Sequence, residues 1–354
     1  FNWFDNNSWY PQGRYIGKTT YPGLMIMCYF FNNFFKFFHI NIELKTICIF
    51  IGPIFSLLIP IFFYLLCILL TKRRSCALLS SSISSISVVL TSCSFIGFFD
   101  NQSISITLIL IDLYLFIRPI INSNFTHQNQ YKSINIIQNN ILMCLIYGFL
   151  SITSGEYAYL ANIFALISFF SIFFGFFSIN LYLTYSIWFV LGTIMSASLP
   201  YIGNKVLFSF AHLFPNLVFI IIQFYSIFCV IRKSLMLSQK VVNSIFFIFI
   251  ILIILIIILL FFLFSYLDCN FIFDRIKYVI FPFLSNKEKS FLYSVEEQNP
   301  TSWSMFYVSL GPFLYTLPIG IYILLKKQLK NKKENEGLFI LILTSIPTFY
   351  FSTT

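Results

Sequence analysis

The chain has 354 residues, of which 58% are hydrophobic and only 10% are charged. Soluble domains average about 45–50% apolar and about 25% charged residues, so this composition excludes a soluble globule of this size. The formal net charge of +10 does not gather on a soluble basic face, and we expect no nucleic-acid partner. Apolar runs of about 18 or more residues recur along the chain and predict membrane-spanning helices.

We therefore predict an all-α membrane protein, a polytopic bundle of about ten transmembrane helices with long loops on one side. Hydropathy places these helices at 45–70, 76–97, 103–118, 137–153, 157–175, 179–197, 214–231, 241–265, 304–325 and 337–352. The predicted parts are a first loop at 1–44, a bundle at 45–265 with a short motif loop at 98–102, a long loop at 266–303, and a final truncated helix pair at 304–354.

The first loop contains a further predicted helix at residues 22–38. Pro22 stands at a plausible helix start, and Asn32, Asn33 and Lys36 form the polar side of a broad apolar stripe. This pattern is typical of an interfacial helix that lies on the membrane.

The cysteines and the start of the chain carry less information. Eight cysteines are scattered without the spacing of a zinc site or a disulfide framework, and we interpret them as small buried residues. The chain begins at Phe1 without a methionine or a signal peptide, which favours an internal piece of a longer protein. The Asn-rich stretch at 122–140 is predicted to be a cytosolic linker.

Basic and acidic residues separate onto opposite predicted faces. The loops on one side carry Lys72, Arg73, Arg74, Arg232, Lys233, Lys240, Lys326, Lys327, Lys330, Lys332 and Lys333. By the positive-inside rule this side is cytosolic. The other side carries Asp5, Glu43, Asp100, Asp268, Asp274, Glu288, Glu296 and Glu297. A carboxylate-lined lumenal face is therefore predicted, although any single acid there is first interpreted as solvated loop surface.

Three segments resemble one enzyme family. The first loop reads NWFDNNSWYPQGRYIGKTTYPGLM from Asn2 to Met25, which closely resembles the first lumenal loop of the catalytic subunits of oligosaccharyltransferases, with their NWFD, WYP, GR and YPGLM. The chain reads GFFDNQSISI around Asp100, where the family has GSFDNEGIAI. From Ser294 it reads SVEEQNPTSW, where eukaryotic members have SVSEHQPTTW. The resemblance spans the chain.

This resemblance implies an activity, partners and a location. The activity is transfer of an oligosaccharide from a polyisoprenyl (dolichyl) pyrophosphate carrier to asparagine in NxS/T sequons. The implied partners are the lipid-linked oligosaccharide, the acceptor polypeptide, the membrane and other oligosaccharyltransferase subunits. The eukaryotic form of the SVEE segment implies the endoplasmic reticulum membrane, with the catalytic loops lumenal.

This transfer reaction requires assistance at two groups, the acceptor amide and the pyrophosphate leaving group. The acceptor amide nitrogen is a poor nucleophile, and a carboxylate that accepts its hydrogen bonds can orient it. A divalent cation, Mn²⁺ or Mg²⁺, can neutralise the pyrophosphate leaving group. By the resemblance Asp100 and Gln102 are the metal positions, Asp100 and Glu297 are the catalytic residues, and Glu297 meets the acceptor asparagine. Glu296 occupies the family's serine position.

The chain departs from the family at several positions. Gln102 stands where the family has a carboxylate, which should weaken metal binding, and Cys93 replaces an arginine. Phe208 and Ala211 replace the basic and acidic residues beside the family's histidine, here His212. The family's first metal-binding aspartate precedes its NWFD segment, and its WWDYG segment would follow Thr354. Only part of the active site is therefore expected within this chain.

Two alternatives stay open. Gln102 and Cys93 would also suit an inactive structural homologue within the same complex. An unrelated transporter would carry intramembrane charge, and Asp112 is nearly the only such residue; an interhelical partner for it is equally plausible. Glu156 is expected to be a solvated loop charge where the family has glycine. His127 and His212 lack neighbouring metal ligands.

The charge distribution predicts the orientation of the loops. A glycosylation or cysteine-accessibility tag at 327–333 should report the cytosol, and a tag at 285–290 should report the lumen, because short Lys- and Arg-rich loops stay inside. The reverse pattern would remove Asp100 and Glu297 from the lumenal compartment and contradict the enzyme assignment.

Overall fold

The computed structural model of the chain describes residues 3–8, 10–122, 131–199, 202–203, 205–235, 244, 302–311, 313–330, 340 and 344–345. The chain divides into two compact units, Phe1–Asn216 with Tyr307–Thr344, and Leu217–Phe306 with Ser345–Thr354. The described part is helical apart from one short hairpin. The first unit carries both the first loop and the loop that contains Asp100.

Five of the described helices are long and apolar enough to cross a membrane: Leu44–Thr71, Gln102–Ile121, Ile136–Thr153, Ile179–Ala197 and Leu213–Arg232. Each coincides with a predicted span. They belong to α3 (Leu44–Ser56) with α4 (Leu58–Thr71), α7 (Gln102–Asn122), α8 (Tyr131–Thr153), α10 (Ile179–Ala197) and α12 (Leu213–Leu235). The predicted helix at 157–175 is α9 (Tyr157–Phe173), which is apolar but shorter.

The helix predicted at 76–97 is instead two helices, α5 (Arg74–Ile86) and α6 (Val88–Ser92), with Ser87 in a non-helical conformation between them. Five serines in α5 donate their hydroxyls to carbonyls three residues earlier: Ser80, Ser81, Ser82, Ser84 and Ser85. Such side-chain bonds compete with the helix hydrogen bonds and favour a break.

The helix predicted at 304–325 is also divided, into α16 (Trp303–Leu310) and α17 (Phe313–Lys330). Gly311 between them has a left-handed φ of 55°, and the following residue in the sequence is a proline, which disfavours helical geometry just before it.

The predicted cytosolic linker at 122–140 is shorter than expected, because residues 131–140 already belong to α8. Except for isolated residues, the predicted helices at 241–265 and 337–352 lie outside the described residues, as does the loop at 266–303.

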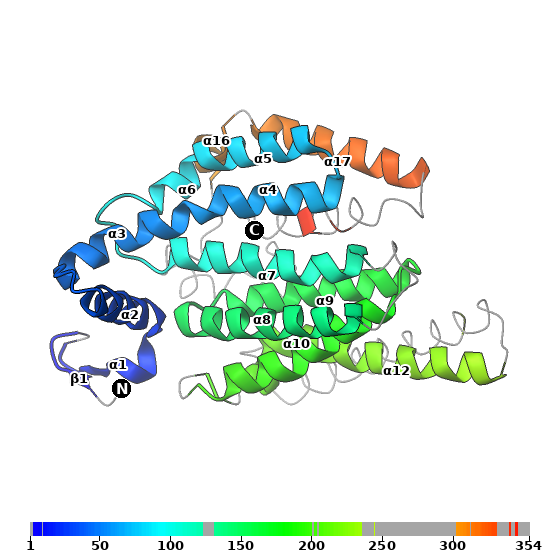
Figure 1. Cartoon of the computed structure of the whole chain (residues 1–354), viewed down its shortest axis with the longest axis horizontal. Helices are drawn as coiled ribbons and strands as arrows, with labels where there is room; N and C mark the ends of the chain where they lie inside the picture. Colours follow the sequence, from blue (N-terminus) through cyan, green and yellow to red (C-terminus); the bar gives the residue numbers. More distant parts are fainter. Residues whose placement is uncertain are drawn as a thin grey trace, which may run out of the picture. The chain divides into compact units, whose positions relative to one another are not determined.

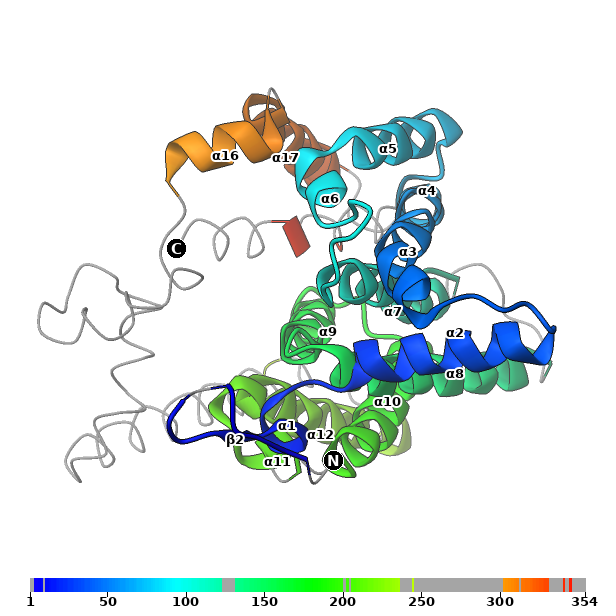
Figure 2. The same ribbon diagram turned by 90° about the vertical axis from the view of Figure 1, so that its left-hand side faces the viewer.

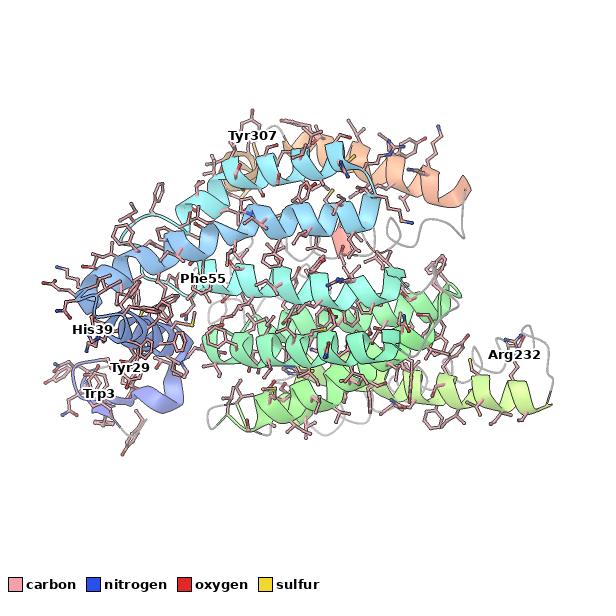
Figure 3. The ribbon with its side chains drawn as sticks, in the orientation of Figure 1. Trp3, Tyr29, His39, Phe55, Arg232 and Tyr307 are labelled. Atoms are coloured by element: carbon pink, nitrogen blue, oxygen red, sulfur yellow. The ribbon has the colours of Figure 1, made fainter. Side chains whose placement is uncertain are left out.

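The first loop folds into a hairpin and two helices. Strand β1 (Phe4–Asp5) pairs antiparallel with β2 (Arg14–Tyr15), and α1 (Ile16–Thr19) and α2 (Gly23–Phe37) come next in the chain. Helix α2 confirms the helix predicted at 22–38. Figure 1 views α2 nearly end-on while α4 and α7 lie in the plane, so α2 runs across the direction of these helices. Its exposed Tyr29 (Figure 3) is a residue type enriched at membrane interfaces.

The helices pack in sequence: α5 folds back on α4 through the turn at Lys72, and α4 contacts α7, α7 contacts α8, and α8 contacts α10. Aromatic rings fill the core between α7, α8, α9 and α10. The rings of Phe116 and Phe164 stack with their centroids 4.1 Å apart. The ring centroid of Trp188 lies 5.0 Å from that of Phe164 and 5.1 Å from that of Tyr147.

Three segments far apart in sequence meet at one end of these helices, which we call the motif end: residues 21–23, 97–102 and 154–156. Helix α7 begins there, and the antiparallel α8 returns there (Figures 1 and 2). A Cβ on Gly23 would lie 2.6 Å from the Thr153 Cα, and a Cβ on Gly155 would lie 2.9 Å from the Tyr21 hydroxyl. The first loop therefore docks directly on the turn between α8 and α9.

This close approach makes a stability prediction. Gly23→Ala should lower the melting temperature of the complete gene product in detergent, because its Cβ would collide with the Thr153 backbone and overpacking costs about 1–3 kcal/mol. Gly320→Ala is the matched control: Gly320 lies in α17 with nothing within 4 Å of a built Cβ, and alanine favours helix. Equal melting temperatures for the two variants would contradict the docking.

Candidate functional site

The loop that carries Asp100 is fixed by a proline in α3. Pro53 has no N–H, so the carbonyl of Ile49 loses its helix donor, and the Gly97 N–H takes its place at 3.2 Å. Gly97 has a φ of +92°, a conformation that favours glycine. On the same helix, a Cβ on Gly52 would lie 3.4 Å from the Phe98 carbonyl oxygen. The motif loop is thus anchored to a membrane helix just before Asp100.

Asp100 and Gln102 lie together at the start of α7. Asp100 is half-buried, and its Oδ1 accepts a hydrogen bond from the Asn101 N–H at 2.6 Å. Gln102 is the first residue of α7 and is exposed, and its Oε1 accepts a hydrogen bond from the Cys93 thiol at 2.8 Å. The two positions at which the chain departs from the family around this motif therefore bond to each other.

Glu156 also lies at the motif end, and its surroundings differ from those predicted from the sequence. It is the N-cap residue of α9, yet its side chain makes no cap hydrogen bond. The residue is half-buried, and its Oε2 is buried with no hydrogen-bond partner. The prediction of a solvated loop charge is therefore wrong, because the docked first loop and the neighbouring helix ends cover this turn.

The charge of Asp100 affects the ionisation of Glu156. Burial raises the pKa of the Glu156 carboxyl above its usual value, and the negative charge of Asp100 raises it further. Two carboxylates from segments more than fifty residues apart in sequence therefore interact electrostatically at the motif end. The signal available in the sequence was an acid in a very short turn between two apolar helices.

His212 packs against Tyr157, the first residue of α9. It belongs to no group of potential metal ligands among the described residues. Its ring is 3% exposed and stacks on Tyr157 at 5.2 Å, and its Nδ1 lies 2.9 Å from the Ser209 hydroxyl. Burial lowers the pKa of His212 to about 4, so the ring is neutral near pH 7. The Ala211 carbonyl accepts a hydrogen bond from the Asn162 amide at 2.8 Å, which ties this loop to α9.

Asp112 lies away from the motif end, in the middle of α7. It is fully buried, and neither carboxylate oxygen has a hydrogen-bond partner in the described part of the chain. The interhelical partner considered from the sequence is not found there.

The remaining predicted site residue, Glu297, lies outside the described residues, as do its neighbour Glu296 and His127. Within the described ranges, no group of three or more His, Cys, Asp or Glu side chains could hold a metal ion. The oxygens that gather at the motif end are nevertheless the hard donors that Mg²⁺ and Mn²⁺ prefer. They include two unpartnered buried atoms, the Oδ1 of Asn101 and the Oε2 of Glu156.

Comparisons with known proteins agree on one family. The family model described as oligosaccharyl transferase STT3, N-terminal, matches residues 1–353. The dolichyl-diphosphooligosaccharide–protein glycosyltransferase subunit stt3 of Schizosaccharomyces pombe is 27% identical over 363 residues, covering 99% of this chain and 44% of the relative.

Two solved structures share the fold. The archaeal oligosaccharyltransferase AglB from Archaeoglobus fulgidus, in complex with an inhibitory peptide and a dolichol-phosphate, superposes with a TM-score of 0.70 at 16% identity, over 99% of this chain and 41% of that chain. The Archaeoglobus fulgidus enzyme in complex with Zn and sulfate gives a TM-score of 0.65 at 16% identity, over 99% of this chain and 40% of that chain.

The raised pKa of Glu156 predicts a pH-dependent stability. A group whose pKa is raised on folding stabilises fully below its unfolded pKa, about 4.3 for glutamate, and that stability is lost as the pH rises through the folded pKa. We therefore compare the melting temperatures of Glu156→Gln and the parent protein in the presence of a chelator. The difference in favour of Glu156→Gln should grow as the pH is raised towards 8.

The control is Glu43→Gln, which changes an exposed acid at the start of α3 and should show no such pH-dependent gain. A difference between Glu156→Gln and the parent that stays constant from pH 4 to pH 8 would contradict the burial of this carboxylate.

Proposed function

This chain belongs to the oligosaccharyl transferase STT3 family, and we propose that the protein transfers an oligosaccharide from a dolichyl pyrophosphate carrier to asparagine in NxS/T sequons. The chain spans less than half the length of the curated relative it matches, 44%, and the proposal concerns the whole protein. It is supported by the relative's name, and by an archaeal homologue that was solved with a peptide and a dolichol-phosphate. The family match excludes the alternative of an unrelated transporter.

The observation that carries the proposal is the position of Asp100. This carboxylate lies at the start of α7, at the end of the bundle where the YPG segment of the first loop docks. Two motifs of the resemblance, separate in the sequence, therefore meet in one place. A transferase that joins a membrane-bound donor to a polypeptide acceptor needs its polar groups at the membrane surface, where both substrates reach.

We assign the proposed roles of Asp100, Gln102 and Glu297 from the chemistry of their side-chain oxygens. Asp100 would hold a divalent cation, Mn²⁺ or Mg²⁺, with the Gln102 oxygen as a weaker donor; a homologue has been crystallised with Zn and sulfate. When bound, such a cation neutralises charge on the pyrophosphate leaving group. Glu297 accepts hydrogen bonds from the acceptor amide, which fixes the amide for attack and weakens its conjugation.

We place the protein in the endoplasmic reticulum membrane with the motif end lumenal, among other oligosaccharyltransferase subunits. The support is the positive charge of the opposite loops and the description of the fission yeast relative as a subunit. About ten spans are proposed for the whole chain, of which the described residues contain five candidates.

A second candidate function is a catalytically inactive homologue within the same complex. The observation that favours it is the hydrogen bond from the Cys93 thiol to the Gln102 Oε1. It occupies a neutral oxygen at the position where the family has a carboxylate, and no cation stands at position 93. Transfer activity of the complete gene product separates the two candidates.

The assignment of Glu297 is tested by Glu297→Gln in the complete gene product, in membranes supplied with lipid-linked oligosaccharide and a fluorescent NxT peptide. We expect kcat at saturating metal to fall by about a hundredfold or more, because a preorganised interaction with the reacting group is lost. The metal concentration at half-maximal rate should not change.

Glu296→Gln is the matched control, because it removes the neighbouring acid at the family's serine position and should leave kcat near that of the parent protein. If Glu297→Gln retains the parent turnover, the acceptor role is wrong. If the parent protein itself shows no transfer, the inactive homologue is favoured.

A further inference from the structure

Two cysteine side chains meet where helix α2 of the first loop contacts α3. The Cys48 sulfur lies 3.7 Å from the Cys28 sulfur, and both thiols are free. Cys67, Cys93 and Cys144 each contact an oxygen atom instead. A contact between two thiols allows a reaction that a single buried cysteine cannot undergo, the formation of a disulfide.

Both cysteines are positioned by helices. Cys28 is 4% exposed and belongs to the buried face of α2, together with Leu24 and with Gly23, which docks against Thr153. Cys48 is half-buried and lies one turn inside α3. Side chains on helices are held more precisely than those on loops, so the contact between the two thiols does not depend on the position of a free loop.

Cys48 also lies beside the anchor of the motif loop. The next residue, Ile49, accepts the hydrogen bond from the Gly97 N–H. A bond between Cys28 and Cys48 would therefore join the first loop to α3 at the point where α3 holds the loop that carries Asp100.

The distance and the surroundings are compatible with a disulfide. The two sulfurs have to approach from 3.7 Å to a bond length of about 2.0 Å, a movement on the scale of a side-chain rotation. Disulfides persist in the lumen of the endoplasmic reticulum and are rare in the cytosol. The first loop is on the lumenal side in the proposed orientation.

We propose that Cys28 and Cys48 form a modification site, at which a disulfide joins α2 to α3 in the folded protein. The inference rests on the proposed function only for the lumenal position of the first loop. It goes beyond that function by assigning a covalent cross-link between the first loop and the membrane bundle.

The oxidant is the disulfide of a lumenal oxidoreductase, and the reaction is thiol–disulfide exchange. Cys48, the more exposed of the two cysteines, attacks this disulfide as a thiolate and releases one of its sulfurs. Cys28 then attacks the Cys48 sulfur and releases the second. Two thiols are oxidised, one disulfide is reduced to two thiols, and the two protons pass to the leaving sulfurs.

The test is peptide mapping of the complete gene product, extracted from its own membranes after free thiols have been blocked with N-ethylmaleimide. Trypsin cleaves after Lys36 and Lys45, which places Cys28 on peptide 19–36 and Cys48 on peptide 46–72. Without reductant we expect one linked species, lighter than the two peptides together by two hydrogen atoms, and after reduction the two separate peptides. N-ethylmaleimide on both Cys28 and Cys48 would overturn the inference.

Cys67→Ser is the matched control, because Cys67 lies on the same tryptic peptide as Cys48. The linked species should persist in Cys67→Ser and disappear in Cys48→Ser. Its persistence in Cys48→Ser would assign the bond to Cys67 and contradict the proposal. If Cys48→Ser does not fold, fragmentation of the linked species from the parent protein distinguishes Cys48 from Cys67.

The bond should also stabilise the folded protein, because a cross-link restricts the unfolded chain. Dithiothreitol should lower the melting temperature of the parent protein by more than that of Cys48→Ser. Equal shifts would contradict a stabilising cross-link.

The cross-link and the transfer reaction fail separately. If the parent protein transfers oligosaccharide while both thiols are free, only the cross-link is wrong. If the linked species is found in a protein without transfer activity, the cross-link stands and the proposed function is wrong.

Discussion

The structure depends on the demand that backbone polar groups of a membrane helix be satisfied within the chain, because lipid offers them no partner. Pro53 in α3 has no N–H, so the Ile49 carbonyl has no donor within the helix. The Gly97 N–H donates to this carbonyl instead. The repair comes from the loop that precedes α7. A helix defect in the first span thereby fixes the segment that carries Asp100, and with it the position of the candidate site.

Close backbone approach is the second determinant of the motif end. Gly23 lies against Thr153, and the Tyr21 hydroxyl lies against Gly155, so the first loop covers the turn between α8 and α9. This cover buries one oxygen of the half-buried Glu156 carboxylate. In a medium of lower dielectric constant charges interact more strongly, and the charge of Asp100 raises the pKa of Glu156.

The departures from the family can be understood together through this geometry. The Cys93 thiol and the Gln102 amide satisfy each other, which is stable without charge and requires neither the arginine nor the carboxylate that the family has there. Glu156 carries a separate acid to the same end of the helices, at the start of α9. A comparison of motifs position by position does not include it, because a residue on another element has no fixed sequence distance from the motif.

The sequence by itself determined the membrane class, five helices now described at their predicted places, the helix at 22–38 and the family, since run length, helical periodicity and motif order are local properties of the chain. It did not predict the division at Ser87, where serine hydroxyls compete for backbone carbonyls, and the role of Glu297 remains a prediction. Only the tertiary structure decided that Glu156 is partly covered and that the charge of Asp100 acts on it. Burial and charge proximity depend on how α7, α8 and α9 pack, and packing joins residues whose separation along the chain carries no signal.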